Sequence, residues 1–180
     1  LWISNGYINL KPLLELCKVL DAANVNLKSF SDAIYRKLNG GRLQPVLDTF
    51  KTMHEQGVHF EMTNLVVPEY VDDDKMVKQM CQWILKNLGP DYPLHFLRFF
   101  PKYKLDRLPA TPLSTLVRFR KLAMAEGIHY VYMGNASEGL RILERSLSIA
   151  DSLDLIYERM VINKEISVAY TRLKNYKKAL

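Results

Sequence analysis

The chain has 180 residues, of which 48% are hydrophobic and 24% charged, and its formal net charge is +6. This balance is typical of a globular protein and excludes the disordered, collagen-like and coiled-coil classes. No window approaches the roughly 18 uninterrupted apolar residues of a membrane span, so we expect no membrane partner. The chain opens on Leu1 without an initiator Met, so we expect the native N-terminus to lie further upstream.

Two cysteines, Cys17 and Cys81, lie 64 residues apart, each inside a helical pattern. Neither has a second cysteine within the spacing of a metal site, which predicts free thiols that are buried or half-buried. Such thiols are typical of a reducing compartment, so we expect a cytoplasmic protein with no metal site of its own.

Strand-like and helical patterns alternate through residue 135. The predicted strands are residues 1–4, 21–27, 58–67, 94–100 and 128–133. The predicted helices are residues 12–20, 43–56, 72–88 and 111–126. Asp72 or Asp73 caps the third helix, Pro112 opens the fourth, and Gly127 ends it.

Four of the strands open near residues 22, 58, 94 and 129, about 36 residues apart. Strand, helix and strand at this spacing predict an α/β fold with five parallel strands, because right-handed crossovers require a parallel sheet. The run of residues 64–67 is largely apolar on both faces, which predicts a sheet covered on both sides.

After residue 135 the pattern becomes purely helical. Residues 137–152 and roughly 155–173 predict two amphipathic helices with no strand between them. Residues 173–180 echo residues 133–140, which is typical of an α-solenoid repeat. We therefore predict two domains, residues 1–135 and a truncated helical segment of residues 136–180.

In a parallel α/β sheet, and above all in a (β/α) barrel, the working residues lie at the C-terminal ends of the strands. The polar residues predicted at that edge are Asn5, Asn26, Lys28, Asn64, Arg98 and Asn135. Three histidines come at strand beginnings, where we expect the opposite edge of the sheet and no zinc site; they are His59, His95 and His129.

Lys28 comes directly after a buried strand, so its ammonium group can hold a carboxylate or phosphate as a point charge. A Schiff-base role needs a general base nearby, and the neighbouring Asn and Ser residues offer none. Glu61 lies in mid-strand and is a candidate interior carboxylate, with an ion pair to Arg98 on the next strand as the alternative.

Two charged clusters admit a structural and a functional interpretation. The basic cluster comprises Arg98, Lys102, Lys104 and Arg107. This cluster is either a binding site for phosphate or nucleic acid or a solvated loop. The loop is favoured, and we expect no nucleic-acid partner. Residues 72–74 are all Asp and either bind a hard cation or cap a helix, of which capping is the simpler. Residues 39–41 lack the Lys-Ser/Thr of a Walker motif and predict a turn.

Six short motifs follow the strand edges in a fixed order. They are residues 4–7 (SNGY), 23–28 (ANVNLK), 41–47 (GRLQPVL), 65–68 (LVVP), 97–103 (LRFFPKY) and 130–135 (YVYMGN). In this order and spacing, residues 1–135 resemble the second half of an AmmeMemoRadiSam-system radical SAM enzyme, related to the pyruvate formate-lyase activating enzymes.

The resemblance implies a partial (β/α) radical SAM barrel that binds S-adenosylmethionine beside a [4Fe-4S] cluster and generates a 5′-deoxyadenosyl radical. It places Asn5, Asn26, Lys28 and Arg98 at the cofactor, with Asn26 where the family usually has Asp and Phe100 where the activating enzymes have His. The CxxxCxxC motif that holds the cluster in the family is missing from this chain. The resemblance therefore implies that the chain alone is inactive and that no catalytic residue lies in it; the substrate is left open.

Residues 136–180 resemble a tetratricopeptide repeat, in which the sequence LKNYKKAL is typical of the turn into the second helix. This resemblance implies a protein partner bound through the helical segment. The alternative function is therefore a non-catalytic interaction module that uses the helical tail.

Overall fold

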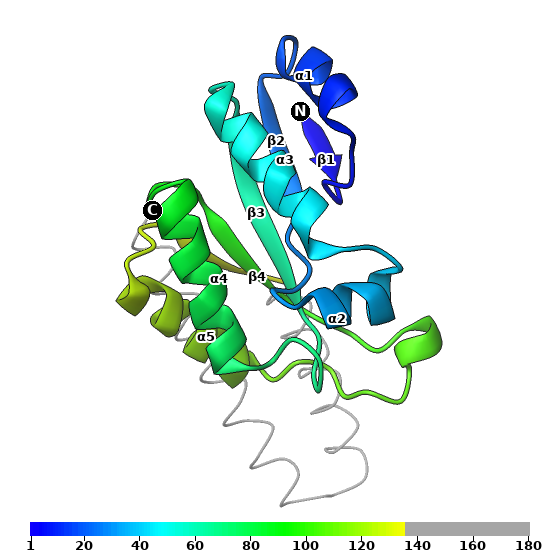
Figure 1. Cartoon of the computed structure of the whole chain (residues 1–180). Helices are drawn as coiled ribbons and strands as arrows, with labels where there is room; N and C mark the ends of the chain where they lie inside the picture. Colours follow the sequence, from blue (N-terminus) through cyan, green and yellow to red (C-terminus); the bar gives the residue numbers. More distant parts are fainter. Residues whose placement is uncertain (136–180) are drawn as a thin grey trace, which may run out of the picture. The chain divides into compact units, whose positions relative to one another are not determined.

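The computed structural model describes residues 1–135, and Leu1–Gly134 form one compact unit (Figure 1). The helices and the repeat predicted for residues 136–180 lie outside the described residues. Within the described residues, strands alternate with helices, as the spacing of about 36 residues predicts.

The strands are β1 (Trp2–Ser4), β2 (Ala22–Asn26), β3 (His59–Val66), β4 (Leu94–Arg98) and β5 (Val131–Gly134). The longer helices are α1 (Leu10–Cys17), α3 (Leu43–Glu55), α4 (Asp74–Asn87) and α5 (Leu113–Glu126). Shorter segments are α2 (Asp32–Ile34), the π-helical turn Tyr35–Asn39 that continues it, and the 3-10 turn Tyr103–Leu105. All five strands pair in parallel in the order β1-β2-β3-β4-β5, which confirms the predicted sheet.

The register of the sheet is staggered between β3 and β4. Ala22 at the start of β2 pairs with His59 at the start of β3. Leu94 at the start of β4, however, pairs with Met62, the fourth residue of β3. Parallel strands must stagger in this way if a sheet is to tilt its strands and curve into a barrel. The stagger also brings the beginning of β4 level with the end of β2.

One face of the sheet is apolar and carries the helices. Phe50 of α3 lies 5.4 Å from Phe60 of β3, and Phe119 of α5 lies 5.6 Å from Phe96 of β4, ring centre to ring centre. The helix α1 packs against α3, and α4 packs against α5, so these four helices belong to the same side of the sheet (Figure 1). Phe50, Phe60, Phe96 and Phe119 are completely buried and form the centre of this core.

Alternate residues point to the other face, which we call the polar face. Its polar side chains are Asn24, Asn26, Glu61, Thr63, His95 and Tyr132, which are linked in register or along their strands; Ile3, Leu65 and Leu97 lie on the same face. Within residues 1–135 the four longer helices pack on the apolar face, so cover on the second face stays a prediction. In a curved sheet the inner face lines the interior and the helices lie outside.

The sequence prediction missed the helical segment 32–39 and treated the chain there as irregular. Its start signal is present, because Ser31 accepts a hydrogen bond from the backbone N–H of Ile34 at 3.5 Å. The segment ends at Gly40, whose φ of 65° is left-handed. It is too short to show helical periodicity, although the turn predicted at residues 39–41 agrees with its end.

Candidate functional site

Three of the four predicted site residues come together where β1 and β2 end. Asn26 closes β2, and its amide donates a hydrogen bond to the backbone oxygen of Ser4 at 2.9 Å. Ser4 pairs with Val25, so Asn5 follows level with Asn26 on the neighbouring strand. Asn5 is exposed, and its Oδ1 accepts a hydrogen bond from the backbone N–H of Tyr7 at 3.0 Å. Lys28 is half-buried, two residues beyond Asn26.

The segment that follows Lys28 fixes its backbone. The N–H of Lys28 donates a hydrogen bond of 3.0 Å to the hydroxyl of Tyr35, which is only 3% exposed. Burial raises the pKa of Tyr35 to about 12, so this hydroxyl keeps its proton at neutral pH. The position of Lys28 therefore depends on the short helix α2 and its continuation.

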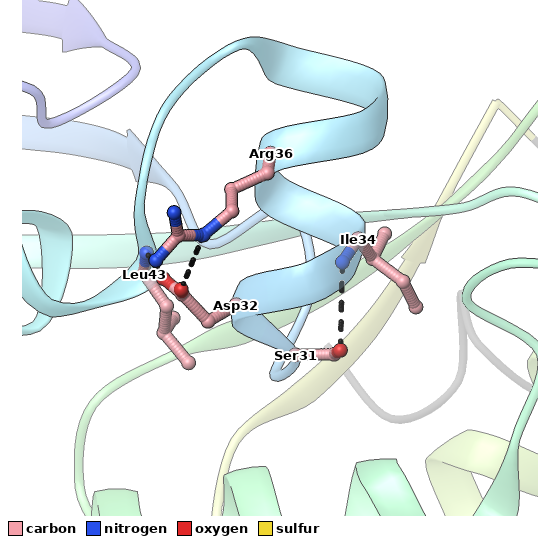
Figure 2. A network of polar contacts seen from close by, with 5 residues as sticks. All are labelled: Ser31, Asp32, Ile34, Arg36 and Leu43. Carbon is pink, nitrogen blue, oxygen red and sulfur yellow. Dashed lines mark hydrogen bonds and ion pairs between the residues drawn. The ribbon is translucent and has the colours of Figure 1, made fainter.

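Asp32 ties this segment to α3 (Figure 2). Its carboxylate accepts hydrogen bonds from the backbone N–H of Leu43 at 3.0 Å and from Nε of Arg36 at 2.9 Å. The Leu43 hydrogen bond, followed by that of Arg36, lowers the pKa of Asp32 below its ordinary value. The segment between residues 32 and 43, which includes Tyr35, is therefore held together by the hydrogen bond from Leu43 to Asp32.

Arg98 is not brought to the same place. Arg98 pairs with Val66 of β3 on the apolar face, whereas Asn26 pairs with Thr63, three residues earlier on β3. Its Nε donates a hydrogen bond of 2.8 Å to the backbone oxygen of Thr111, and its guanidinium lies 5.0 Å from the ring centre of Phe100. The edge of the sheet beside it is closed by an apolar cluster of Val67, Val71, Met76, Phe99 and Leu108. The role of Arg98 at a cofactor stays a prediction.

A connected set of side chains crosses the polar face: Thr63, His95 and Tyr132 lie level with Asn26, and Asn24 and Glu61 lie one step below it. Thr63 donates its hydroxyl to Oδ1 of Asn24 at 2.8 Å, and Nδ2 of Asn24 lies 3.4 Å from Oε2 of Glu61. The same Oε2 lies 3.0 Å from Nε2 of His95. The ring of His95 stacks on that of Tyr132, with centres 5.0 Å apart and planes at 26°. These contacts join four neighbouring strands.

Two sequence predictions are corrected by this geometry. His95 does not lie at the opposite edge, because the stagger sets it level with Thr63 and Asn26. The alternative that Glu61 pairs with Arg98 is wrong, because its partner is His95, whereas Arg98 lies level with Val66. Both errors arose from counting positions along each strand separately. Thr63 and Tyr132 were missed for the same reason.

The other charged sequence candidates lie at a helix start and on an exposed loop. Asp73 caps α4 by accepting hydrogen bonds from the backbone N–H groups of Lys75 and Met76 at 3.1 and 3.3 Å, as predicted. Lys102, Lys104 and Arg107 are exposed on the loop after β4. Within residues 1–135, no group of three His, Cys, Asp or Glu side chains is placed to hold a metal ion, and no helix is long and apolar enough to cross a membrane.

The comparison of sequences finds a longer relative. No protein-family model matches the chain. The chain is 43% identical over 133 residues to an uncharacterized protein of Methanocaldococcus jannaschii. The match covers 74% of this chain and 39% of that protein, so the chain spans about two fifths of the length of the relative.

The comparison of structures decides the fold. A domain of pyruvate-formate lyase-activating enzyme from Bacteroides vulgatus superimposes with a TM-score of 0.65 at 11% identity, covering 74% of this chain and 80% of the domain. The described residues have the fold of a partial radical SAM barrel. A radical SAM methyltransferase from Sphaerobacter thermophilus gives a TM-score of 0.59 at 11% identity, covering 73% of this chain and 39% of the enzyme. SuiB from Streptococcus suis, bound to S-adenosylmethionine, gives 0.58 at 10% identity, covering 74% and 32%.

Proposed function

We propose that the chain is part of a radical SAM enzyme and binds S-adenosylmethionine at the C-terminal edge of its sheet. The observation that carries the proposal is the convergence of Asn5, Asn26 and Lys28 from neighbouring strands, on a fold shared with SuiB, which has been solved with S-adenosylmethionine. The side chains fit the chemistry of the cofactor, since amides suit ribose hydroxyls and an ammonium group suits a carboxylate. Arg98 is the fourth residue predicted at the cofactor, but it lies apart from these three, so the proposal rests on Asn5, Asn26 and Lys28.

The residues of this chain do not fit the iron-sulfur cluster. A cluster needs thiolate ligands, and this chain has two cysteines in separate helices. Burial, together with the charge of Glu126, raises the pKa of Cys81 to about 12, and burial also raises the pKa of Cys17. We therefore propose that the ligands of a [4Fe-4S] cluster come from outside these 180 residues. With such a cluster supplied from outside the chain, one electron from the cluster would cleave the cofactor held here into methionine and a 5′-deoxyadenosyl radical.

Titration calorimetry with S-adenosylmethionine tests the proposal. The Lys28→Gln variant removes the charge proposed to hold the carboxylate of the cofactor. We expect about tenfold weaker binding of S-adenosylmethionine, which corresponds to about 1.4 kcal/mol. Binding of 5′-methylthioadenosine, which has no carboxylate, should not change.

Lys86→Gln is the matched control, because Lys86 is exposed in the last turn of α4, the helix that leads back from the C-terminal edge to the start of β4. Failure of the wild-type chain to bind S-adenosylmethionine would overturn the proposal. The cluster assignment has its own test, since anaerobic reconstitution of the 180-residue chain should give no four-iron absorption band. Appearance of that band would contradict ligands from outside the chain.

The second candidate function is a cytoplasmic interaction module without catalysis. It rests on the echo between residues 133–140 and 173–180, which is typical of helical repeats that bind protein partners. If this function is correct, deleting residues 136–180 abolishes capture of the partner while the sheet remains folded. Undiminished capture by the shortened chain would refute it.

A further inference from the structure

The five strands contain one acidic residue, Glu61, and it lies on the polar face. In register it pairs with Asn24, one step along the face from Asn26 and Thr63. Its side chain is 39% exposed, so the charge stays partly in water while the carboxylate lies on a face that, in a closed barrel, lines the interior. Glu61 is therefore a solvated acceptor and not a residue of the core.

Neighbouring side chains orient the carboxylate of Glu61 without covering it. Nδ2 of Asn24 donates a hydrogen bond to Oε2 at 3.4 Å, and Nε2 of His95 lies 3.0 Å from the same oxygen, a close ion-pair distance without hydrogen-bond geometry. The other oxygen, Oε1, has no hydrogen-bond partner among residues 1–135, and the side chain is 39% exposed. Within residues 1–135, one carboxylate oxygen thus remains available on the polar face.

The partners of Glu61 are themselves held in place. Stacking on Tyr132 supports the ring of His95, and the hydroxyl of Thr63 binds Oδ1 of Asn24 at 2.8 Å. A charged acceptor that is oriented in advance loses little side-chain entropy when a ligand binds. This is the arrangement expected of a binding group and not of a mobile surface carboxylate.

We infer that Glu61 binds a positively charged group of S-adenosylmethionine; this inference rests on the proposed function. The cofactor carries two cations, its ammonium and its sulfonium, and a site on this face needs a negative charge to receive either. Glu61 is the acidic side chain that β1 to β5 supply. Lys28, beyond the end of β2, is the complementary group for the cofactor carboxylate, so opposite charges of the ligand meet opposite charges of the chain.

The test is titration calorimetry of the 180-residue chain with three probes. S-adenosylmethionine carries both cations, S-adenosylhomocysteine carries the ammonium alone, and 5′-methylthioadenosine carries neither. The Glu61→Gln variant keeps the shape of the side chain and removes its charge. We expect about tenfold weaker binding of S-adenosylmethionine and unchanged binding of 5′-methylthioadenosine.

The second probe identifies which cation is bound. An equal loss for S-adenosylhomocysteine assigns the ammonium, and no loss assigns the sulfonium. Glu55→Gln is the control, because Glu55 is exposed at the end of α3. It should leave all three affinities unchanged.

Three results would overturn the inference. Equal binding of S-adenosylmethionine by the wild type and by Glu61→Gln would show that the charge of Glu61 is not used. An equal loss for 5′-methylthioadenosine would show that the substitution merely damages the site. A wild-type chain that binds none of the probes would refute the proposed function as well, whereas the first two results leave that function standing.

Discussion

Thr111 joins three segments at the C-terminal edge of the sheet through one buried hydroxyl. It accepts a hydrogen bond from the backbone N–H of Phe99 at 2.9 Å and donates one to the backbone oxygen of Val66. Thr111 is 0% exposed, so water does not replace either bond. Thr111→Val keeps the shape of the side chain and removes both bonds. A buried polar group left without its partner costs about 1–3 kcal/mol, so we expect the free energy of unfolding to fall by roughly 2–4 kcal/mol.

Urea unfolding followed by tryptophan fluorescence measures this loss. The matched control is Thr115→Val, because Thr115 is also buried, at 9% exposure, and its hydroxyl takes part in none of the hydrogen bonds described for residues 1–135. The control should change stability by less than about 1 kcal/mol. A Thr111→Val variant within about 0.5 kcal/mol of the wild type would refute the reasoning, because it would mean that both backbone groups find other partners.

Three further substitutions probe the segments that hold the predicted site. Gly6→Ala should lower the free energy of unfolding by about 2–4 kcal/mol, because Gly6 has a φ of 71° and an added Cβ would lie 2.8 Å from Cγ1 of Val25. Gly40→Ala has a similar φ of 65° with nothing within 4 Å, so it should lose only about 1–2 kcal/mol, and equal losses in thermal melts would contradict the packing argument. Asp32→Asn should destabilise the protein at neutral pH but not in acid, since a lowered pKa gives stability above the unfolded value of about 3.9 that is lost as pH falls through the folded value. Urea midpoints measured from pH 7 to pH 2 check this, and a difference that persists at pH 2 would contradict it.

Most of the fold could be predicted from sequence because its start and stop signals are local. Asp73 caps α4 and Gly127 ends α5 as expected, and the strand positions follow from apolar runs of the right length. The helical segment 32–39 was missed, since eight residues give too few turns for a periodic pattern. Local sequence signals therefore predicted where most helices and strands begin and end. They could not predict a helix too short to show a periodic pattern.

The candidate site was harder to predict because it depends on register. Asn5 and Asn26 were found because both follow the end of a strand, and β1 and β2 end together. His95 was assigned to the wrong edge because it is the second residue of β4. No feature of a single strand reports that β4 starts opposite the fourth residue of β3. Register is a property of paired strands, so the polar face emerges only from the assembled sheet.

The two faces of the sheet divide stability from binding. Val25 and Met62 point into the core and are completely buried, whereas the adjacent Asn24 and Glu61 point to the polar face. Apolar residues on that face would give a more favourable burial energy than hydrogen-bonded polar ones. The strands nevertheless place amide, hydroxyl, imidazole and carboxylate groups there, already connected to one another. A sheet built only to be stable gains nothing from this arrangement, so we interpret the polar face as the part of the chain shaped for a ligand.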